Sequence, residues 1–319
     1  LALGSSLGVS LYPDDGRTVE ALMANADMAL YRAKESGRGA YRFFKREMDD
    51  TIRERRNLAR DLRQGIADNE LLVHYQPLAR AADGDVCGFE ALVRWPQANA
   101  RRIGPDVFIP LAESLDLVHE LGMQMLDQSC RCLKAWRDHG IANDEISISV
   151  NLSARQLTQL DLADQIVACI ERHDLPPGAL KLEITEGTLV TRKELATSQL
   201  GKLRAKGLKI LIDDFGTGYS SLSYLHSIPC DTIKLDGSFI REIVRDTRLR
   251  AIVGASIHLA HELGMSVVAE CIETSAQADL LKELNCNFGQ GYLFSPAIPA
   301  DKVEAWLTTR ASTVQRSHA

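Results

Sequence analysis

The chain has 319 residues, of which 45% are hydrophobic and 25% are charged, and its formal net charge is -6. This composition is typical of a soluble globular protein, and the length allows a large barrel with an appendage. The basic excess that binds a nucleic-acid backbone is missing, so no DNA or RNA duplex is expected as a partner. A small anionic substrate would need local cations, either basic side chains or bound metal.

The cysteine pattern predicts reduced thiols and a cytoplasmic location, because the cysteines are odd in number and scattered through apolar segments. They are Cys87, Cys130, Cys132, Cys169, Cys230, Cys271 and Cys286. Cys130-x-Cys132 is a weak indication of zinc, but no second close Cys/His pair accompanies it in the sequence, so no zinc site is expected. No apolar run approaches the ~18–20 residues of a membrane helix. No signal peptide is visible, and since the chain starts without Met, a membrane link is expected only through upstream segments.

The N-terminal residues predict a small α+β piece followed by a connector. Residues 7–11 alternate like a strand and 19–34 have helical spacing, ended by glycine. We expect this fragment to cover 1–44. Residues 45–66 are dense in charge with one apolar stripe, which predicts a solvated connector helix; a signalling helix that transmits strain between domains is the alternative.

Strands and helices alternate over the rest of the chain, which predicts an α/β protein with a (β/α)8 TIM-like barrel over 67–312 and a tail at 313–319. The expected strands are 72–76, 87–93, 146–151, 180–184, 208–212, 232–235, 266–269 and 289–293. The helices between them are amphipathic, as in 111–136. Only Arg80 to Asp85 joins the first two strands, too short for a helical crossover, so this pair is expected to be antiparallel. A doubly wound open sheet is the alternative, but no GxGxxG follows the first strand.

The segment KILIDDFGTGY, residues 209–219, places two acids at the end of an apolar strand. Asp213 and Asp214 repel each other unless a cation lies between them. Gly216 and Gly218 free the backbone for a tight loop. A helix N-cap would also explain one aspartate, so from this segment alone a metal site and a cap remain open alternatives.

The other strand ends carry acids and amides as well, which favours one shared site. The residues are Glu90, Asn151, Glu183, Glu186, Asp213, Asp214, Lys234, Asp236, Glu270, Glu273 and Gln290. Taken singly, each could be a buried group satisfied by a neighbour. Together, oxygen ligands without histidine suit Mg²⁺ or Mn²⁺, and two such ions about 3.5–4 Å apart form the usual clamp for phosphoryl chemistry. Lys234 could position a water or pair with a neighbouring acid. Arg94 is a candidate phosphate fork.

Two resemblances follow from these motifs. From about Leu58 to Leu307 the chain resembles the EAL family of cyclic-di-GMP phosphodiesterases, in an ordered set of motifs at barrel spacing. They are YQP at 75–77, Glu90-Ala91-Leu92, FIPLAE at 108–113, NLSARQL at 151–157, EITE at 183–186, DDFGTGYSSL at 213–222, IKLD at 233–236 and QGYLF at 290–294. Upstream, SLGVSLYPDDG and ADMALYRAKESGRGAYRFF resemble the C-terminal quarter of a GGDEF (diguanylate cyclase) domain. Its signature loop would lie before Leu1, so cyclase activity is not expected of this chain.

The EAL resemblance implies a role for each matching residue. It implies two metal ions, the first held by Glu90, Asn151, Glu183 and Asp213, and the second by Asp213, Asp214 and Glu270. It implies that Lys234 holds the attacking water, that Glu270 is a candidate base, and that Glu186 anchors the loop after Asp214. The substrate positions that it implies are Gln76, Leu92, Arg94, Asp236, Glu273 and Gln290.

The same resemblance implies hydrolysis of cyclic-di-GMP to linear pGpG; a sensor module that binds cyclic-di-GMP without cutting it is the alternative. It also implies a homodimer through the Asp213–Leu225 loop and the following helix. The chain departs from the family at Cys271 and Ile272, where AECIE replaces the usual AEGVE. Cys271 could displace the second-metal ligand if the backbone there requires a positive φ. Met123-Gln124-Met125 stands where the family often has Trp, which we interpret as a change in core packing.

Overall fold

A computed structural model describes residues 5–35, 39–96, 103–191, 193–217 and 229–317. The chain divides into two compact units, Leu1–Ala67 and Asp68–Ala319.

The first unit is a two-stranded parallel sheet with helices. β1 (Leu7–Val9) pairs with β2 (Tyr41–Phe43), and the helices are α1 (Val19–Glu35) and α2 (Arg46–Ala67). α1 lies so close to β1 that a Cβ added at Gly8 would come within 2.2 Å of the Leu30 nitrogen. The strand expected at 7–11 ends at Val9, because Asp15 accepts the Leu11 backbone N–H at 2.7 Å and turns the chain.

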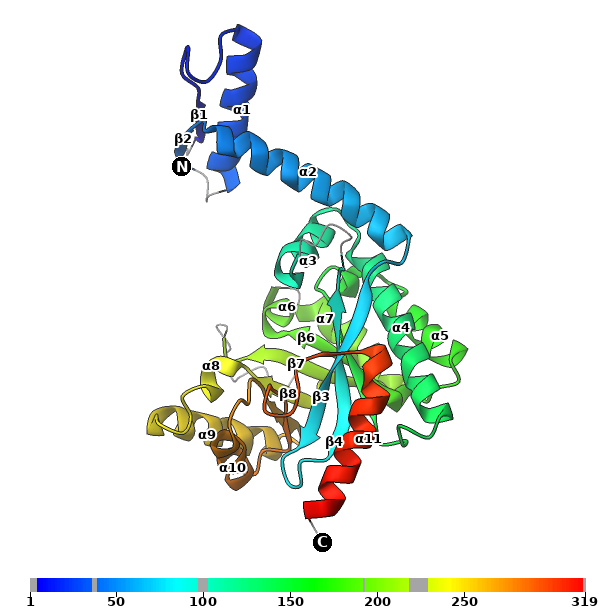
Figure 1. Cartoon of the computed structure of the whole chain (residues 1–319). Helices are drawn as coiled ribbons and strands as arrows, with labels where there is room; N and C mark the ends of the chain where they lie inside the picture. The colour runs from blue at the N-terminus through cyan, green and yellow to red at the C-terminus, as the bar shows by residue number, and fades with distance from the viewer. Residues whose placement is uncertain (1–4, 36–38, 97–102, 192, 218–228, 318–319) are drawn as a thin grey trace. The chain divides into compact units, whose positions relative to one another are not determined.

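The second unit is a closed eight-stranded barrel, as the alternating pattern predicts (Figure 1). Its strands are β3 (Leu72–Arg80), β4 (Val86–Arg94), β5 (Ser147–Asn151), β6 (Leu180–Thr185), β7 (Lys209–Phe215), β8 (Thr232–Leu235), β9 (Ser266–Ala269) and β10 (Phe288–Gly289). Neighbours in sequence are neighbours in the sheet, and β10 pairs with β3 to close the ring. The predicted antiparallel first pair is confirmed: β3 runs antiparallel to β4, and β4 to β10 are mutually parallel. A short β11 (Ile298–Pro299) also pairs with β3.

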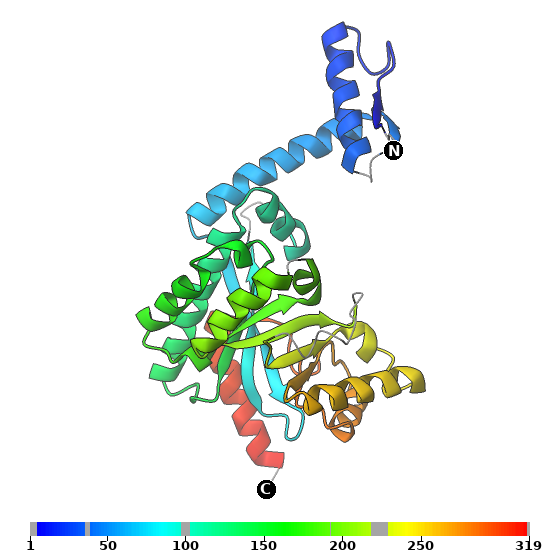
Figure 2. The ribbon, with the colours of Figure 1, turned by 180° about the vertical axis from the view of Figure 1, so that it is seen from behind.

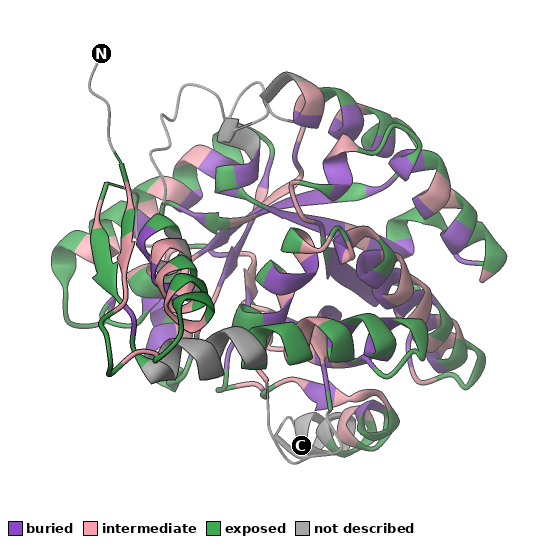
Figure 3. Ribbon diagram, turned by 90° about the horizontal axis from the view of Figure 1, so that it is seen from above, coloured by how far each residue is buried: buried purple, intermediate pink, exposed green. Residues whose placement is uncertain are grey.

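Helices surround the barrel and present buried inner faces to the strands (Figures 2 and 3). They are α3 (Pro105–Ser114), α4 (Val118–Asp138), α5 (Leu162–Arg172), α6 (Glu186–Thr191), α7 (Lys193–Ala205), α8 (Gly237–Ile240), α9 (Thr247–Glu262), α10 (Ser275–Glu283) and α11 (Ala300–Ser317). No helix of the described residues combines the length and the apolar character needed to cross a membrane.

Side-chain alternation along β3 and β4 separates the outer core from the barrel interior. Tyr75 and Phe89 lie under the helices, with the Trp136 ring of α4 centred 4.9 Å and 5.3 Å from theirs. Residues one position along each strand, Gln76 and Glu90, are register partners and face the other way. This alternation turns Glu90 into the barrel.

Several expected elements differ in extent, and two of them in the barrel unit are cut short. The helix expected at 111–136 is two helices: α3 ends at Ser114, and Asp116 adopts a left-handed φ of 59° before α4 begins at Val118. The strand expected at 289–293 is Phe288–Gly289 only. Beyond it, Gln290 accepts the Ile272 N–H at 3.0 Å and Ile272 accepts the Leu293 N–H at 2.9 Å, so this segment bonds to the chain after β9 instead of extending the sheet.

Candidate active site at the mouth of the barrel

The ammonium of Lys234 is the centre of a buried carboxylate cluster. Lys234 is 1% exposed on the third residue of β8. Its Nζ lies 2.7 Å from Glu183 Oε2, 2.7 Å from Glu270 Oε1, 3.1 Å from Glu90 Oε2 and 3.3 Å from Asp213 Oδ1. The four acids come from β4, β6, β7 and the residue after β9. Residues up to 144 positions away in the sequence therefore lie within hydrogen-bond distance of Lys234, at one end of the parallel strands.

A bulge in β7 places both aspartates at this site. The β7–β8 register pairs Ile212 with Ile233 and then Phe215 with Leu235, so Asp213 and Asp214 together oppose the single residue Lys234. In a regular strand two successive side chains point to opposite faces, and a bulge removes that constraint. Asp214 takes a left-handed φ of 55°. Carboxylate oxygens of Asp213, Asp214 and Glu270 consequently all lie within 4.8 Å of one another.

Two amides fix the orientation of Glu90. Asn151 Nδ2 donates to Glu90 Oε1 at 3.0 Å, and Gln290 Nε2 donates to Glu90 Oε2 at 2.8 Å. Asn151 closes β5 next to Glu183, with which it is in register. The structure thus brings Glu90, Asn151, Glu183 and Gln290 together at the barrel mouth.

Crowding of the acids perturbs their ionisation. Burial, reinforced by the charges of Glu90 and Asp213, raises the pKa of Glu183 to about 8, and burial raises that of Glu270 to about 7. Burial and the Asp213 charge also raise the pKa of Asp214. Glu90 differs: burial opposes its ionisation, but the Lys234 charge and the hydrogen bonds from Gln290 and Asn151 outweigh burial and lower its pKa.

The donor set fits divalent cations of the hard type. Glu90, Glu183, Asp213, Asp214 and Glu270 place five carboxylates around one ammonium. Five negative charges against one positive charge leave an excess of four when all are ionised, which matches two divalent cations. The protein oxygens are carboxylates with an amide oxygen available from Asn151, and this oxygen set suits Mg²⁺ or Mn²⁺ better than zinc.

Glu186 lies at the base of the loop that follows the two aspartates. It is buried at the start of α6, and its Oε2 accepts the backbone N–H of Gly216 at 2.8 Å. Gly216 has a φ of 95°, which favours glycine. The Asp213–Leu225 loop expected to form a dimer contact lies largely in residues 218–228, outside the described part of the chain.

The substrate positions expected on β3 and β4 share the inner face with Glu90. Leu92 and Arg94 follow Glu90 at intervals of two, and they pair with His74 and Leu72. Arg94 donates to the Val93 carbonyl at 2.9 Å and forms no ion pair with a described carboxylate. Burial lowers its pKa, opposed by Glu90. A half-buried guanidinium without a carboxylate partner among the described residues is suited to bind an anion.

Three other expected substrate residues form hydrogen bonds with neighbouring parts of the barrel unit. Gln76 Nε2 donates to the Ser295 carbonyl at 3.5 Å. Asp236 caps α8 by accepting the Ser238 N–H at 2.9 Å, and its charge contributes to the raised pKa of Asp214, so it borders the cluster. Glu273 is exposed, and its backbone N–H donates to Gln277 Oε1 at 2.9 Å beside the capping box of α10.

Tyr292 is a residue of this mouth that the sequence reasoning did not assign. Its side chain is 71% exposed, and it is close enough to Arg94 to act on the pKa of that guanidinium. An aromatic residue directly after Gln290-Gly291 was the available signal. An exposed ring beside a cation is suited to stack on a planar base.

Cys271 occupies a left-handed backbone position, with φ of 55°. The backbone position that holds Cys271 in place of the family's usual glycine therefore does require a positive φ. Glu270 nevertheless lies 2.7 Å from Lys234. The Cys271 Sγ is 2.5 Å from where a Cβ on Gly237 would be, so Gly237 gives the thiol its space. Cys271 thus leaves Glu270 within the cluster.

The chain is thus a closed α/β barrel with a cluster of carboxylates at the carboxyl ends of its strands, and these carboxylates are suited to bind divalent cations. The family model described as "EAL domain" matches residues 59–297, and the chain belongs to this family. The model described as "Diguanylate cyclase, GGDEF domain" matches residues 1–40, so a GGDEF fragment precedes the barrel.

Curated relatives align with nearly the whole chain. The chain is 56% identical over 308 residues to an uncharacterized signaling protein of Caulobacter vibrioides, covering 97% of this chain and 37% of that protein. It is 42% identical over 303 residues to the bifunctional diguanylate cyclase/cyclic di-GMP phosphodiesterase MucR of Pseudomonas aeruginosa, covering 95% and 44%. A solved structure of the MucR phosphodiesterase in complex with c-di-GMP superposes with a TM-score of 0.73 and 40% identity, covering 77% of this chain and 99% of that one. The chain spans less than half the length of these two curated relatives.

Proposed function

We propose that this chain hydrolyses one phosphodiester bond of cyclic-di-GMP to give linear pGpG, in second-messenger signalling. The observation that carries the proposal is the convergence of Glu90, Glu183, Asp213 and Glu270 on Lys234 at the barrel mouth. The similarity to a MucR structure that holds c-di-GMP supports this substrate.

The proposed cofactors are two ions of Mg²⁺ or Mn²⁺. Glu90, Asn151, Glu183 and Asp213 would hold the first ion, and Asp213, Asp214 and Glu270 the second. When bound, such ions lower the pKa of water and neutralise charge on the phosphodiester. Oxygens of Asp213, Asp214 and Glu270 already lie within 4.8 Å of one another, which supports the second set.

The side chains of the site have distinct proposed tasks. The Lys234 ammonium donates to the attacking water and holds it for in-line displacement at phosphorus. Glu270, a proposed ligand of the second ion, is also the candidate base that would accept a proton from that water. Arg94 binds a non-bridging phosphate oxygen, while Gln76, Leu92, Asp236, Glu273 and Gln290 line the path of the nucleotide. Tyr292 offers its ring to a guanine.

Product formation tests the proposal directly. Purified protein with Mg²⁺ or Mn²⁺ is expected to convert cyclic-di-GMP to pGpG, measured by anion-exchange chromatography. Glu90→Ala and Lys234→Ala are expected to abolish conversion, whereas Lys209→Ala, at an exposed lysine paired with Asp231, is expected to keep it. Undiminished conversion by both site variants would place the chemistry elsewhere.

A non-catalytic cyclic-di-GMP sensor is the second candidate, but every expected metal ligand is present, which weighs against it. Calorimetry with cyclic-di-GMP in EDTA measures binding alone, and the product assay in Mn²⁺ measures turnover. Binding without product under any divalent ion would favour the sensor.

We further propose the domain limits 1–44, 45–66, 67–312 and 313–319, a cytoplasmic location, and a homodimer through the Asp213–Leu225 loop and the helix after it. Sedimentation of the wild type against Tyr224→Asp tests the dimer. Unchanged association would remove this surface from the proposal.

A further inference from the structure

A second cluster of metal-ligating side chains lies between α4 and α5, outside the carboxylate site. Oδ1 of Asp127, Sγ of Cys169 and Nε2 of His173 belong to one group whose ligand atoms all lie within 4.8 Å of one another. Asp127 Oδ1 is 2.9 Å from His173 Nε2 and 3.8 Å from Cys169 Sγ. The thiol of Cys130 lies next to this group and hydrogen-bonds to Cys169, although it is not one of the atoms within that mutual distance. One thiol, one imidazole and one carboxylate therefore converge, with a second thiol beside them.

Helical spacing explains the convergence. Asp127 and Cys130 are three residues apart on α4, and Cys169 and His173 are four apart at the end of α5, so each pair lies on one face of its helix. α4 packs against α5. The side chains span from core to surface: Cys130 and Cys169 are buried, whereas Asp127 and His173 are partly exposed.

A hydrogen-bonded link between the helices accounts for only part of this arrangement. Arg172 Nη1 donates to Asp127 Oδ1 at 3.1 Å, and with His173 it satisfies the carboxylate. That network has no need of two thiols beside it. Arg172 is 65% exposed, so it can move away from Asp127 when a cation takes its place.

We propose that Asp127, Cys130, Cys169 and His173 form a structural site for one Zn²⁺ ion that joins α4 to α5. The mixed sulfur, nitrogen and oxygen set is the kind that zinc takes and that Mg²⁺ avoids. Tetrahedral bonds of about 2.0–2.3 Å place neighbouring ligand atoms roughly 3.3–3.8 Å apart. The observed separations, 2.9 Å from Asp127 to His173 and 3.8 Å from Asp127 to Cys169, differ from this range by about half an ångström or less, and Cys130 must move toward the ion to complete the shell.

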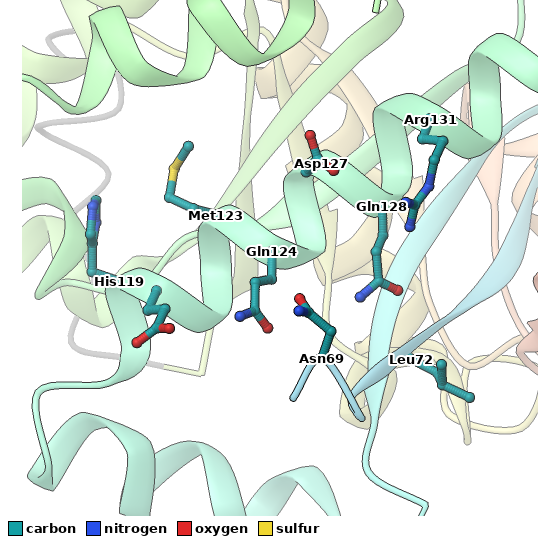
Figure 4. A pocket seen from close by; sticks show the side chains of 9 residues that line it. Asn69, Leu72, His119, Met123, Gln124, Asp127, Gln128 and Arg131 are labelled. Carbon is teal, nitrogen blue, oxygen red and sulfur yellow. The ribbon is translucent and has the colours of Figure 1, made fainter. Parts of the chain in front are cut away.

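One of the proposed ligands, Asp127, lies at the wall of a cavity. Asp127 lines a cavity of about 750 Å³ with other residues of α4, and Figure 4 shows it between Met123 and Arg131 along one edge of that helix. The cavity shares no lining residue with the carboxylate cluster around Lys234. The zinc site is thus separate from the proposed catalysis.

Cobalt replaces zinc as the probe, because a thiolate–cobalt bond gives a charge-transfer absorption that oxygen ligands cannot give. The full chain, reduced and kept in excess Mg²⁺ to occupy the carboxylate site, is titrated with Co²⁺ and then with Zn²⁺. We expect the absorption to saturate at one equivalent of Co²⁺ and to be abolished by one equivalent of Zn²⁺. Binding of Zn²⁺ is also expected to raise the melting temperature of the protein.

Variants separate this site from other thiols. Cys169→Ser and His173→Gln are expected to weaken Co²⁺ binding at least tenfold, while Cys230→Ser, at another buried cysteine, and Asp213→Asn are expected to leave it unchanged. His173→Gln covers the case in which Cys169→Ser does not fold. Absence of a thiolate absorption, its persistence in both site variants, or recovery of Cys130 and Cys169 as a disulfide from reductant-free protein would each overturn the proposal.

Discussion

The ammonium of Lys234 lies 2.7 Å from a carboxylate oxygen of Glu183, and both side chains are almost completely buried. Burial of two charges is costly unless they are paired. Here the lysine has more carboxylates than it can neutralise, and the Glu183, Glu90 and Glu270 charges hold its pKa well above its usual range despite burial. Lys234 is therefore held in its charged form, and the surrounding carboxylates, when ionised, carry more negative charge than it neutralises.

Replacing Lys234 with methionine is expected to lower kcat at least about a hundredfold, since general acid–base and positioning groups contribute ~10²–10⁴-fold. Removal of the positive charge leaves the carboxylates free for metal, so Mn²⁺ affinity measured by calorimetry is expected to rise. Lys209→Met, on the neighbouring strand, serves as the control. A Lys234→Met protein that loses Mn²⁺ binding together with turnover would show that the lysine organises the ligands instead of the water.

The metal-free protein is expected to lose stability as the pH rises from about 5 to 8. Glu183 and Glu270 have pKa values near 4.5 when unfolded and about 8 and about 7 when folded, so the folded state binds more protons in this range. The free energy of unfolding then falls with increasing pH. Urea denaturation in EDTA at several pH values measures this slope.

Saturating Mn²⁺ is expected to flatten or reverse the dependence of the free energy of unfolding on pH, because metal binding requires the ionised carboxylates. Glu183→Gln is expected to flatten it without metal. Identical slopes with and without Mn²⁺ would mean that these two acids do not bind the ion.

Substituting Cys271 with glycine is expected to stabilise the protein by about 0.5–1 kcal/mol. A left-handed φ costs a non-glycine residue ~1–2 kcal/mol, and the greater freedom of glycine in the unfolded chain returns about 0.5–1 kcal/mol of that. Cys271→Ala is the matched control, since it removes the thiol but keeps the Cβ. Thermal denaturation compares the three proteins. Equal gains from Gly and Ala would trace the effect to the thiol near Gly237 and not to the backbone.

Replacing Glu186 with glutamine is expected to weaken the hold on Gly216 and lower kcat about tenfold, with a smaller effect on the melting temperature. The carboxylate accepts the Gly216 N–H at 2.8 Å, and a charge-assisted bond of this kind is roughly twice as strong as a neutral one. Product assays and Mn²⁺ calorimetry measure the change. An unaltered rate would mean that the position of the Asp213–Asp214 bulge does not depend on this anchor.

The order of strands and helices was available from the sequence because buried parallel strands leave short apolar runs and helices leave a 3.6-residue pattern. The short Arg80–Asp85 link likewise determined the antiparallel pair. Such local signals do not mark where a regular element is interrupted. Asp116 ends α3 within an uninterrupted amphipathic pattern, and Gln290 leaves the sheet to bond with Ile272.

The residue types of the barrel site, carboxylates and amides at strand ends, were also set by the sequence. Only the tertiary structure decided how they meet. Strict alternation would turn Asp213 and Asp214 to opposite faces, and the bulge opposite Lys234 brings them together. Likewise, the partner of Cys130 is not Cys132, which hydrogen-bonds to Tyr75, but Cys169 on the next helix. Sequence spacing predicts which side chains are neighbours along one helix or strand. Which side chains meet in one site depends on how several helices and strands pack together.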